Sequence, residues 1–264
     1  MSRSIGLLII VILIAGGVTL LFRQPAPVEE SALSASKITL TGHHDDGTSA
    51  WSIRAQGGSL IDGGGELEIV ELTFFENSTP RFIVRGDRLV RTSAGSTLAG
   101  AVQIEQATTM NLSTESVFWD ERNSTLESGP AKIVMDRINL EAGAFHHNLN
   151  TDITTLTRGI EARLTQDGVP YTVTSDSADA TSQRLALYGD VTIESDEGSD
   201  HYDCQRLESD TSGTSVRLTG DVTGVWNHSA FSASDVELDA TGIRFRGDVV
   251  IDLQAHQVDD SHDA

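Results

Sequence analysis

The chain is poor in the residues that cross-link a fold or fill a large core. Its 264 residues include one cysteine, Cys204, and 5 prolines, and aromatic residues make up only 5%. A single cysteine excludes an internal disulfide framework and any multi-cysteine metal site, and we expect Cys204 to be a solvated free thiol. With so few aromatic side chains, any core must consist mainly of Val, Ile, Leu and Ala.

Basic residues are also scarce. Lys and Arg number 18 against 39 Asp and Glu, which gives a formal net charge of −21 at pH 7. A charge of this sign and size argues against nucleic acid as a partner and against broad binding of anionic lipid headgroups. The composition therefore predicts no nucleic-acid partner.

One long uncharged segment, residues 5–22, lies near the N-terminus. It is about as long as a helix must be to cross a bilayer, so we predict one transmembrane helix within residues 1–23. A polar linker with two prolines follows over residues 24–36, and its acidic residues favour an orientation with the N-terminus inside. The alternative is a cleaved signal peptide, whose apolar region is only about 7 to 15 residues long.

The rest of the chain repeats one short pattern, in which apolar residues alternate with others on both sides of a glycine. Its clearest copies read LYGDVTI and FRGDVVI, and the last three glycines are 31 and 27 residues apart. A fixed spacing of this kind marks a repeat architecture. The glycines of the series are Gly100, Gly129, Gly159, Gly189, Gly220 and Gly247.

Within each copy, alternation with period two predicts a half-buried antiparallel strand. Leu187 and Val191, for example, share the apolar face around Gly189. The copy at Gly159 breaks this phase, and a bulge near Arg158 would repair it. A second strand type lies between the glycine copies, at residues 110–120, 137–147, 171–181 and 230–240. With the turn formers between them, these patterns predict about fifteen strands in a meander.

The predicted architecture is therefore all-β: an open roll of stacked antiparallel strand pairs, or jellyroll, behind one N-terminal transmembrane helix. The apolar faces would line an interior of small aliphatic side chains. An incompletely filled interior of this kind could hold an acyl chain. The alternative is that these side chains only pack against each other.

Two features resemble a known family. The segment Trp51-Ser-Ile-Arg-Ala55 resembles the W-x-L-x-A motif that opens LptC domains, and the later Gly-Asp-Val copies resemble strands of the LptA/OstA-like fold. The resemblance implies a membrane-anchored periplasmic protein of lipopolysaccharide export, located at the inner membrane and without a cofactor. It further implies transfer of lipopolysaccharide from an LptB/F/G-like ABC transporter to a soluble LptA-like homologue.

The chain is longer than a typical LptC domain. The resemblance implies an LptC-like roll over residues 37–168, an LptA/OstA-like continuation over 169–255, and a disordered acidic tail over 256–264. One lengthened roll and two fused units both fit this division, and with it stays open whether a separate LptA partner is needed.

The resemblance also implies two sets of functional residues. The expected lipid-binding groove is lined by Trp51, Ile53, Val102, Ile104, Val191, Ile193, Val249 and Ile251. Open strand edges that could pair with partner proteins are expected at Ile38, Leu40, Gly247, Val249, Ile251 and Leu253.

No pattern indicates an enzyme or a metal site. The pairs His43-His44 and His146-His147 are adjacent, and neighbouring residues of a strand point to opposite faces, so neither pair chelates well. Ser, His and Asp are plentiful, but no nucleophile elbow occurs. The hypotheses that compete with lipid transfer are a tethered structural or adhesive β-solenoid without lipid and, less well supported, a surface hydrolase.

Overall fold

The computed structural model describes most of the chain after the predicted anchor. The described residues are 33–61, 64–106, 110–135, 138–166, 169–181, 183–196, 198, 200–210, 215–226, 229–239 and 241–252. The predicted transmembrane helix, most of the predicted linker and the predicted acidic tail lie outside them. Among the described residues, none belongs to a helix long and apolar enough to cross a membrane.

All regular structure in this part of the chain is β. The strands are β1 (Leu33–His43), β2 (Ser49–Ile61), β3 (Gly64–Glu76), β4 (Thr79–Thr92), β5 (Gly95–Gln106), β6 (Met110–Asp120), β7 (Thr125–Ser128), β8 (Ala131–Met135), β9 (Ile138–Asn148), β10 (Ile153–Gln166), β11 (Val169–Ser175), β12 (Ser177–Ala180), β13 (Arg184–Ser195), β14 (His201–Asp210), β15 (Ser215–Trp226), β16 (Ser229–Asp239), β17 (Gly242–Arg246) and β18 (Val250–Asp252). The first strand begins at Leu33, inside the segment predicted as linker.

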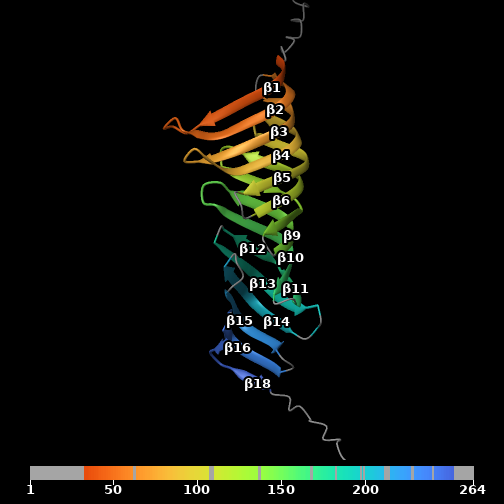
Figure 1. The fold of residues 1–264 in the computed structure, drawn as a ribbon, viewed down its shortest axis with the longest axis vertical. Helices are drawn as coiled ribbons and strands as arrows, with labels where there is room; N and C mark the ends of the chain where they lie inside the picture. The colour runs from red at the N-terminus through yellow and green to blue at the C-terminus, as the bar shows by residue number, and fades with distance from the viewer. Residues whose placement is uncertain are drawn as a thin grey trace, which may run out of the picture. The chain divides into compact units, whose positions relative to one another are not determined.

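The strands form a stack in which antiparallel neighbours follow one another along the chain (Figure 1). Three strand pairs, β7 with β8, β11 with β12 and β17 with β18, are the two halves of interrupted strands, since both halves pair with a common neighbour. Counted this way, the described residues form fifteen rungs, which agrees with the number expected from the alternation. Pairing continues without a break from β9 through β10 to β11.

The repeated glycines bend every second rung. Gly100, Gly189 and Gly220 have φ values of 84°, 73° and 84° and sit at one-residue bulges, where the register shifts against the neighbouring rungs. This left-handed region is open to glycine at no steric cost. The predicted bulge near Arg158 is confirmed, because the register of β10 shifts between Thr157 and Ile160.

The other members of the series fit the same line of bends. Gly129 lies in the interruption between β7 and β8, and Gly247, with φ 84°, lies between β17 and β18. In the first and third rungs, Lys37 and Ile69 take left-handed φ values of 62° and 51° without any glycine. The bend is therefore older in the stack than the glycine pattern reveals.

The bends divide each rung between two faces, and each face carries a row of apolar residues that pair directly from strand to strand. The first ladder comprises Ile53, Leu72, Val84, Ile104, Leu112, Ile133, Leu140, Ala162, Val173, Ile193, Tyr202, Gly224, Phe231 and Ile251. The second ladder comprises Leu67, Leu89, Leu98 and Val117, then Phe145, Leu156, Ala178, Leu187, Leu207, Leu218, Val236 and Phe245.

The two ladders meet in one interior. Their buried members belong to a single hydrophobic cluster. Near the last rungs, the rings of Phe231 from the first ladder and Phe245 from the second lie 4.9 Å apart between centroids, edge to face. The fold is thus two β faces, joined at a line of bends, around a continuous aliphatic core.

Candidate functional site

Most residues expected to line a groove lie in this interior. Ile53, Ile104 and Ile193 are members of the first ladder. Val102 and Val191 follow the bulges of their rungs, and both are fully buried. Side chains chosen from alternation alone therefore share one space.

The remaining three lie at the margins of that space. Trp51 is only partly buried and packs at the edge of the core. Val249 and Ile251, at the last rung, are 40% and 46% exposed. Ile251 nonetheless pairs directly with the buried Phe231, so it belongs to the inward face of a rung that nothing described covers further along the chain. Whether any of these residues touches lipid stays a prediction.

In this structure the interior is occupied by its own side chains. The five predicted groove residues inside it are between 0% and 7% exposed. Burial of this order means that the side chains of the two faces are in contact. An acyl chain can enter only if the two faces separate.

The faces meet again along a seam, opposite the line of bends, where hairpin ends from one side of the stack contact those from the other. Trp119, at the end of β6, packs edge to face against Trp51 of β2 and Phe74 of β3, with centroids 5.3 Å and 5.1 Å apart. A pocket of about 250 Å³ opens beside these rings, and Arg81 and Leu149 also line it. Aromatic pairs of this geometry contribute roughly 0.5–1.5 kcal/mol each beyond their buried area.

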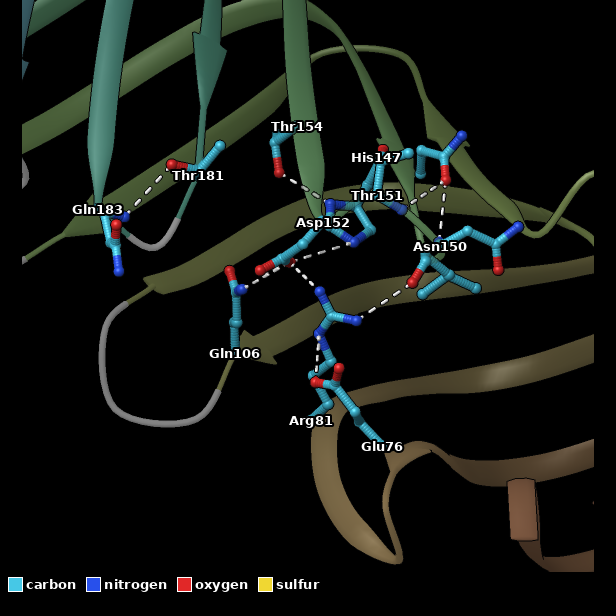
Figure 2. Close-up of polar contacts among 12 residues, drawn as sticks. Glu76, Arg81, Gln106, His147, Asn150, Thr151, Asp152, Thr154, Thr181 and Gln183 are labelled. Carbon is cyan, nitrogen blue, oxygen red and sulfur yellow. Dashed lines mark hydrogen bonds and ion pairs between the residues drawn. The ribbon is translucent and has the colours of Figure 1, made fainter. Parts of the chain in front are cut away.

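A polar network lies next to the aromatic group (Figure 2). Arg81 of β4 contacts Asp152, in the turn between β9 and β10, with 2.6 Å between Nη2 and Oδ1. Its Nη1 also donates to the carbonyl oxygen of Leu149 at 3.2 Å, and Gln106 Nε2 donates to Asp152 Oδ1 at 3.1 Å. The side chains of Arg81 and Asp152 are 19% and 27% exposed, so the ion pair is partly shielded from water and stronger than a surface pair.

His147 lies directly behind this network. Its side chain is fully buried, its Nδ1 is 2.9 Å from Thr154 Oγ1, and its ring centroid is 4.5 Å from that of Phe82. Its Nε2 has no hydrogen-bond partner among the described residues and lies 4.0 Å from Asp152 Oδ1. Burial lowers the pKa of His147 to about 4, although the charge of Asp152 acts in the opposite direction. His147 is therefore neutral at physiological pH.

His146 and His147 point to opposite faces, as expected for neighbours on a strand. The side chain of His146 is half-exposed, with Nδ1 3.3 Å from Glu127 Oε1. The described residues contain no group of three or more His, Cys, Asp or Glu side chains placed to hold a metal ion.

Sequence reasoning missed the seam. Arg81, Gln106 and Asp152 belong to separate hairpins, and no local pattern connects them. His147 was considered only as a metal ligand. Its alternation phase, shared with the buried Phe145, was the one signal that could have placed it inside the roll.

The expectation for Cys204 was wrong. Its side chain is buried, 6% exposed, and it pairs across the strands with the fully buried Val191. Burial raises the pKa of the thiol to about 11, so at neutral pH it is a protonated core side chain and a poor nucleophile. It shares its alternation phase with Tyr202, which the charged residues around it obscured.

The expected partner edges lie in the first and last rungs, at opposite ends of the stack (Figure 1). Ile38 of β1 is buried and Leu40 is partly buried. At the other end, Gly247 bends the rung, and Val250, between Val249 and Ile251, is 65% exposed. Leu253 lies outside the described residues. The pairing of these edges with other proteins stays a prediction.

The largest surface hollow, about 970 Å³, follows the line of bends across β6 to β13. Charged side chains line much of it, including Glu115, Glu161, Asp190 and the Lys132–Glu141 ion pair at 2.7 Å. A lining of this polarity does not suit an acyl chain.

No protein-family model and no curated protein matches this chain. Among solved structures, one match is LptH from Pseudomonas aeruginosa, described as the LptA-homologous periplasmic component of the conserved lipopolysaccharide transport device. The match has 8% sequence identity and a TM-score of 0.36, and it covers 55% of this chain and 95% of that one. A likeness at this level carries no functional argument, and membership of the LptC family stays a prediction.

Proposed function

We propose that this chain is a lipid-transfer protein of the lipopolysaccharide export type and not an enzyme. In this proposal residues 1–23 anchor it once in the inner membrane and the roll lies in the periplasm. The roll accepts lipopolysaccharide from an LptB/F/G-like ABC transporter and passes it to a periplasmic LptA-like bridge.

The observation that carries the proposal is the interior. Two directly paired apolar ladders run through the stack, and the contacts found at the seam are made by side chains. A continuous aliphatic space that is bounded on one side by side-chain contacts can take up acyl chains without breaking a strand pairing. Its members are small or aliphatic, which leaves few large rings to displace.

Photocrosslinking from adjacent residues of β5 tests lipid binding. A photoreactive side chain at Ile104, which faces the interior, is expected to capture lipopolysaccharide in cells. The same side chain at Gln103, which is exposed on the other face, is expected to capture none. The measurement is lipopolysaccharide detected on the purified, irradiated protein.

Equal capture at both positions would indicate random contact with lipid. If neither Ile104 nor a second interior position such as Ile133 yields a crosslink in cells that actively export lipopolysaccharide, the transfer function is contradicted. Ile133 is fully buried in the first ladder, so it samples the same space further along the stack.

We also propose that the two end rungs dock different partners by strand addition. The first rung, at Ile38 and Leu40, follows the anchor in the chain and is assigned to the transporter. The last rung, from Gly247 to Leu253, is assigned to the soluble homologue. The exposed apolar side chains of β18 support this assignment, since a partner strand would cover them.

Deleting residues 242–264 is expected to abolish contact with the soluble homologue and to leave membrane insertion and transporter contact intact. The deletion removes β17 and β18, whereas a control deletion of 256–264 removes only the predicted tail and should keep both contacts. Co-purification with each partner is the measurement. Retention of the soluble homologue by the longer deletion would rule out β18 as the docking edge.

A tethered structural β-solenoid is the second candidate. The specific observation in its favour is the filled interior, in which the predicted groove residues are buried by one another. In that case interior and exterior probes would both fail to capture lipid, while the stack would keep its stability.

A further inference from the structure

The seam network has a property that a purely structural contact does not require. It places an ion pair, Arg81–Asp152, directly in front of a fully buried histidine whose Nε2 is unpaired among the described residues. An unpaired buried nitrogen costs free energy, so the arrangement sacrifices stability at this one place. The cost is recovered as soon as His147 is hydrated.

We propose that Arg81, Gln106 and Asp152 form a latch on a lateral gate, through which acyl chains enter the interior beside Phe82 and His147. The gate is the part of the seam between the first residues of β4 and the hairpin that joins β9 to β10. This inference rests on the proposed lipid-transfer function for its ligand, but the latch itself can be tested without lipid.

The geometry of the latch suits a movable contact. Arg81 reaches Asp152 and the Leu149 carbonyl from a strand on the opposite side of the seam, and Gln106 reaches the same carboxylate (Figure 2). These are side-chain contacts, so they can break while every strand pairing of β4 and β10 is kept. Asp152 itself sits in the turn with φ 58°, at the tip of the hairpin.

Opening at this point would uncover apolar rings. The ring of Phe82 lies between the Arg81 guanidinium, 5.5 Å from its centroid, and the ring of His147. Phe145, the second-ladder residue of β9, stacks on the other side of His147 at 6.4 Å. An incoming acyl chain would replace the contact between the two faces with contacts to these same rings.

Protonation of His147 favours the open gate. The charged groups that face His147 are Asp152 in the hairpin, Arg81 of β4 and His146 on its own strand. In the closed state, burial holds its pKa at about 4, whereas a hydrated histidine titrates near 6.5. The open state therefore binds a proton that the closed state does not, and closure is weakened as the pH falls from about 6.5 toward 4. The largest possible effect on the closed-to-open ratio is about 300-fold.

The latch is tested by hydrogen exchange on the full-length protein in nanodiscs. Asp152→Asn removes the charge but keeps the shape, and asparagine tolerates the left-handed turn position. We expect amide exchange over residues 148–154 to rise about tenfold, with the global unfolding midpoint nearly unchanged. Glu141→Gln, which breaks the exposed Lys132–Glu141 pair on a nearby rung, is the matched control and should leave that segment unchanged.

The same segment should respond to pH in the unmodified protein. After correction for intrinsic exchange rates, its opening should increase between pH 7.5 and pH 5, while exchange in β13 and β14 should not. His147→Leu fills the site without a titrating group and should remove the pH response. If this variant folds poorly, the pH profile of the unmodified protein decides the matter, and a flat profile overturns the role of His147.

Uptake of a fluorescent fatty acid from phospholipid vesicles separates the latch from the proposed function. Faster uptake by Asp152→Asn than by Glu141→Gln supports the gate. Faster local exchange with no uptake by any variant supports the latch and contradicts both its role as a lipid gate and lipid transfer. Unchanged exchange at residues 148–154 in Asp152→Asn overturns the latch, whatever the uptake.

Discussion

Val102→Asp is expected to lower the free energy of unfolding by about 4 kcal/mol, enough to remove a large part of the stability of a typical domain. Val102 is fully buried next to the bulge of β5, where a carboxylate would have neither water nor a counter-charge. The loss combines the apolar contacts of valine with the cost of desolvating the new group. Chemical denaturation measured by circular dichroism gives the value.

Gln103→Asp is the matched control. Gln103 is the next residue along the same strand, points to solvent and pairs with Arg85 on β4. A carboxylate there gains an opposite charge across the strands, so the change should stay within about 0.5 kcal/mol. Similar destabilisation by both substitutions would show that the two residues do not face opposite sides of the roll.

Trp119→Ala is expected to cost about 4 kcal/mol, because it removes the ring on which the aromatic part of the seam is built. Trp119 is 4% exposed and packs against Trp51 and Phe74, which come from the opposite side of the seam. Its loss would also free the Trp51 ring, so near-ultraviolet circular dichroism should weaken by more than one tryptophan's share. Thermal and chemical denaturation report the stability.

Trp226→Ala provides the comparison. Trp226 is at the end of β15, 44% exposed, and its removal should cost no more than about 0.5 kcal/mol. A small loss at Trp119, close to that at Trp226, would mean that the seam contributes little to holding the two faces together. The proposed gate would then need no latch.

Local pattern was sufficient for the strands and their facing. The segment 110–120, read from alternation, is strand β6, Met110–Asp120. The phase break at Gly159 led to the bulge that the register of β10 contains. Both succeed because side-chain direction in a strand has a period of two residues, which neighbouring residues alone determine.

The pattern failed where geometry depends on distant parts of the chain. Lys37 and Ile69 take the left-handed bend without glycine, so glycine spacing could not reveal that the bends begin in the first rung. The contact of Arg81 with Asp152 depends on how far the twist of several intervening strands turns one edge toward the other. No property of either residue's neighbours contains that information.

Pairing between neighbours along the chain also determines the order in which this molecule can be built. A rung needs only the strand made before it, so a polypeptide delivered with its N-terminus first can add each hairpin as it arrives. No early strand waits with an open edge for a partner from the far end of the sequence. The growing end of the incomplete chain is then its one sticky place, and the brief β18 limits that hazard once synthesis is complete.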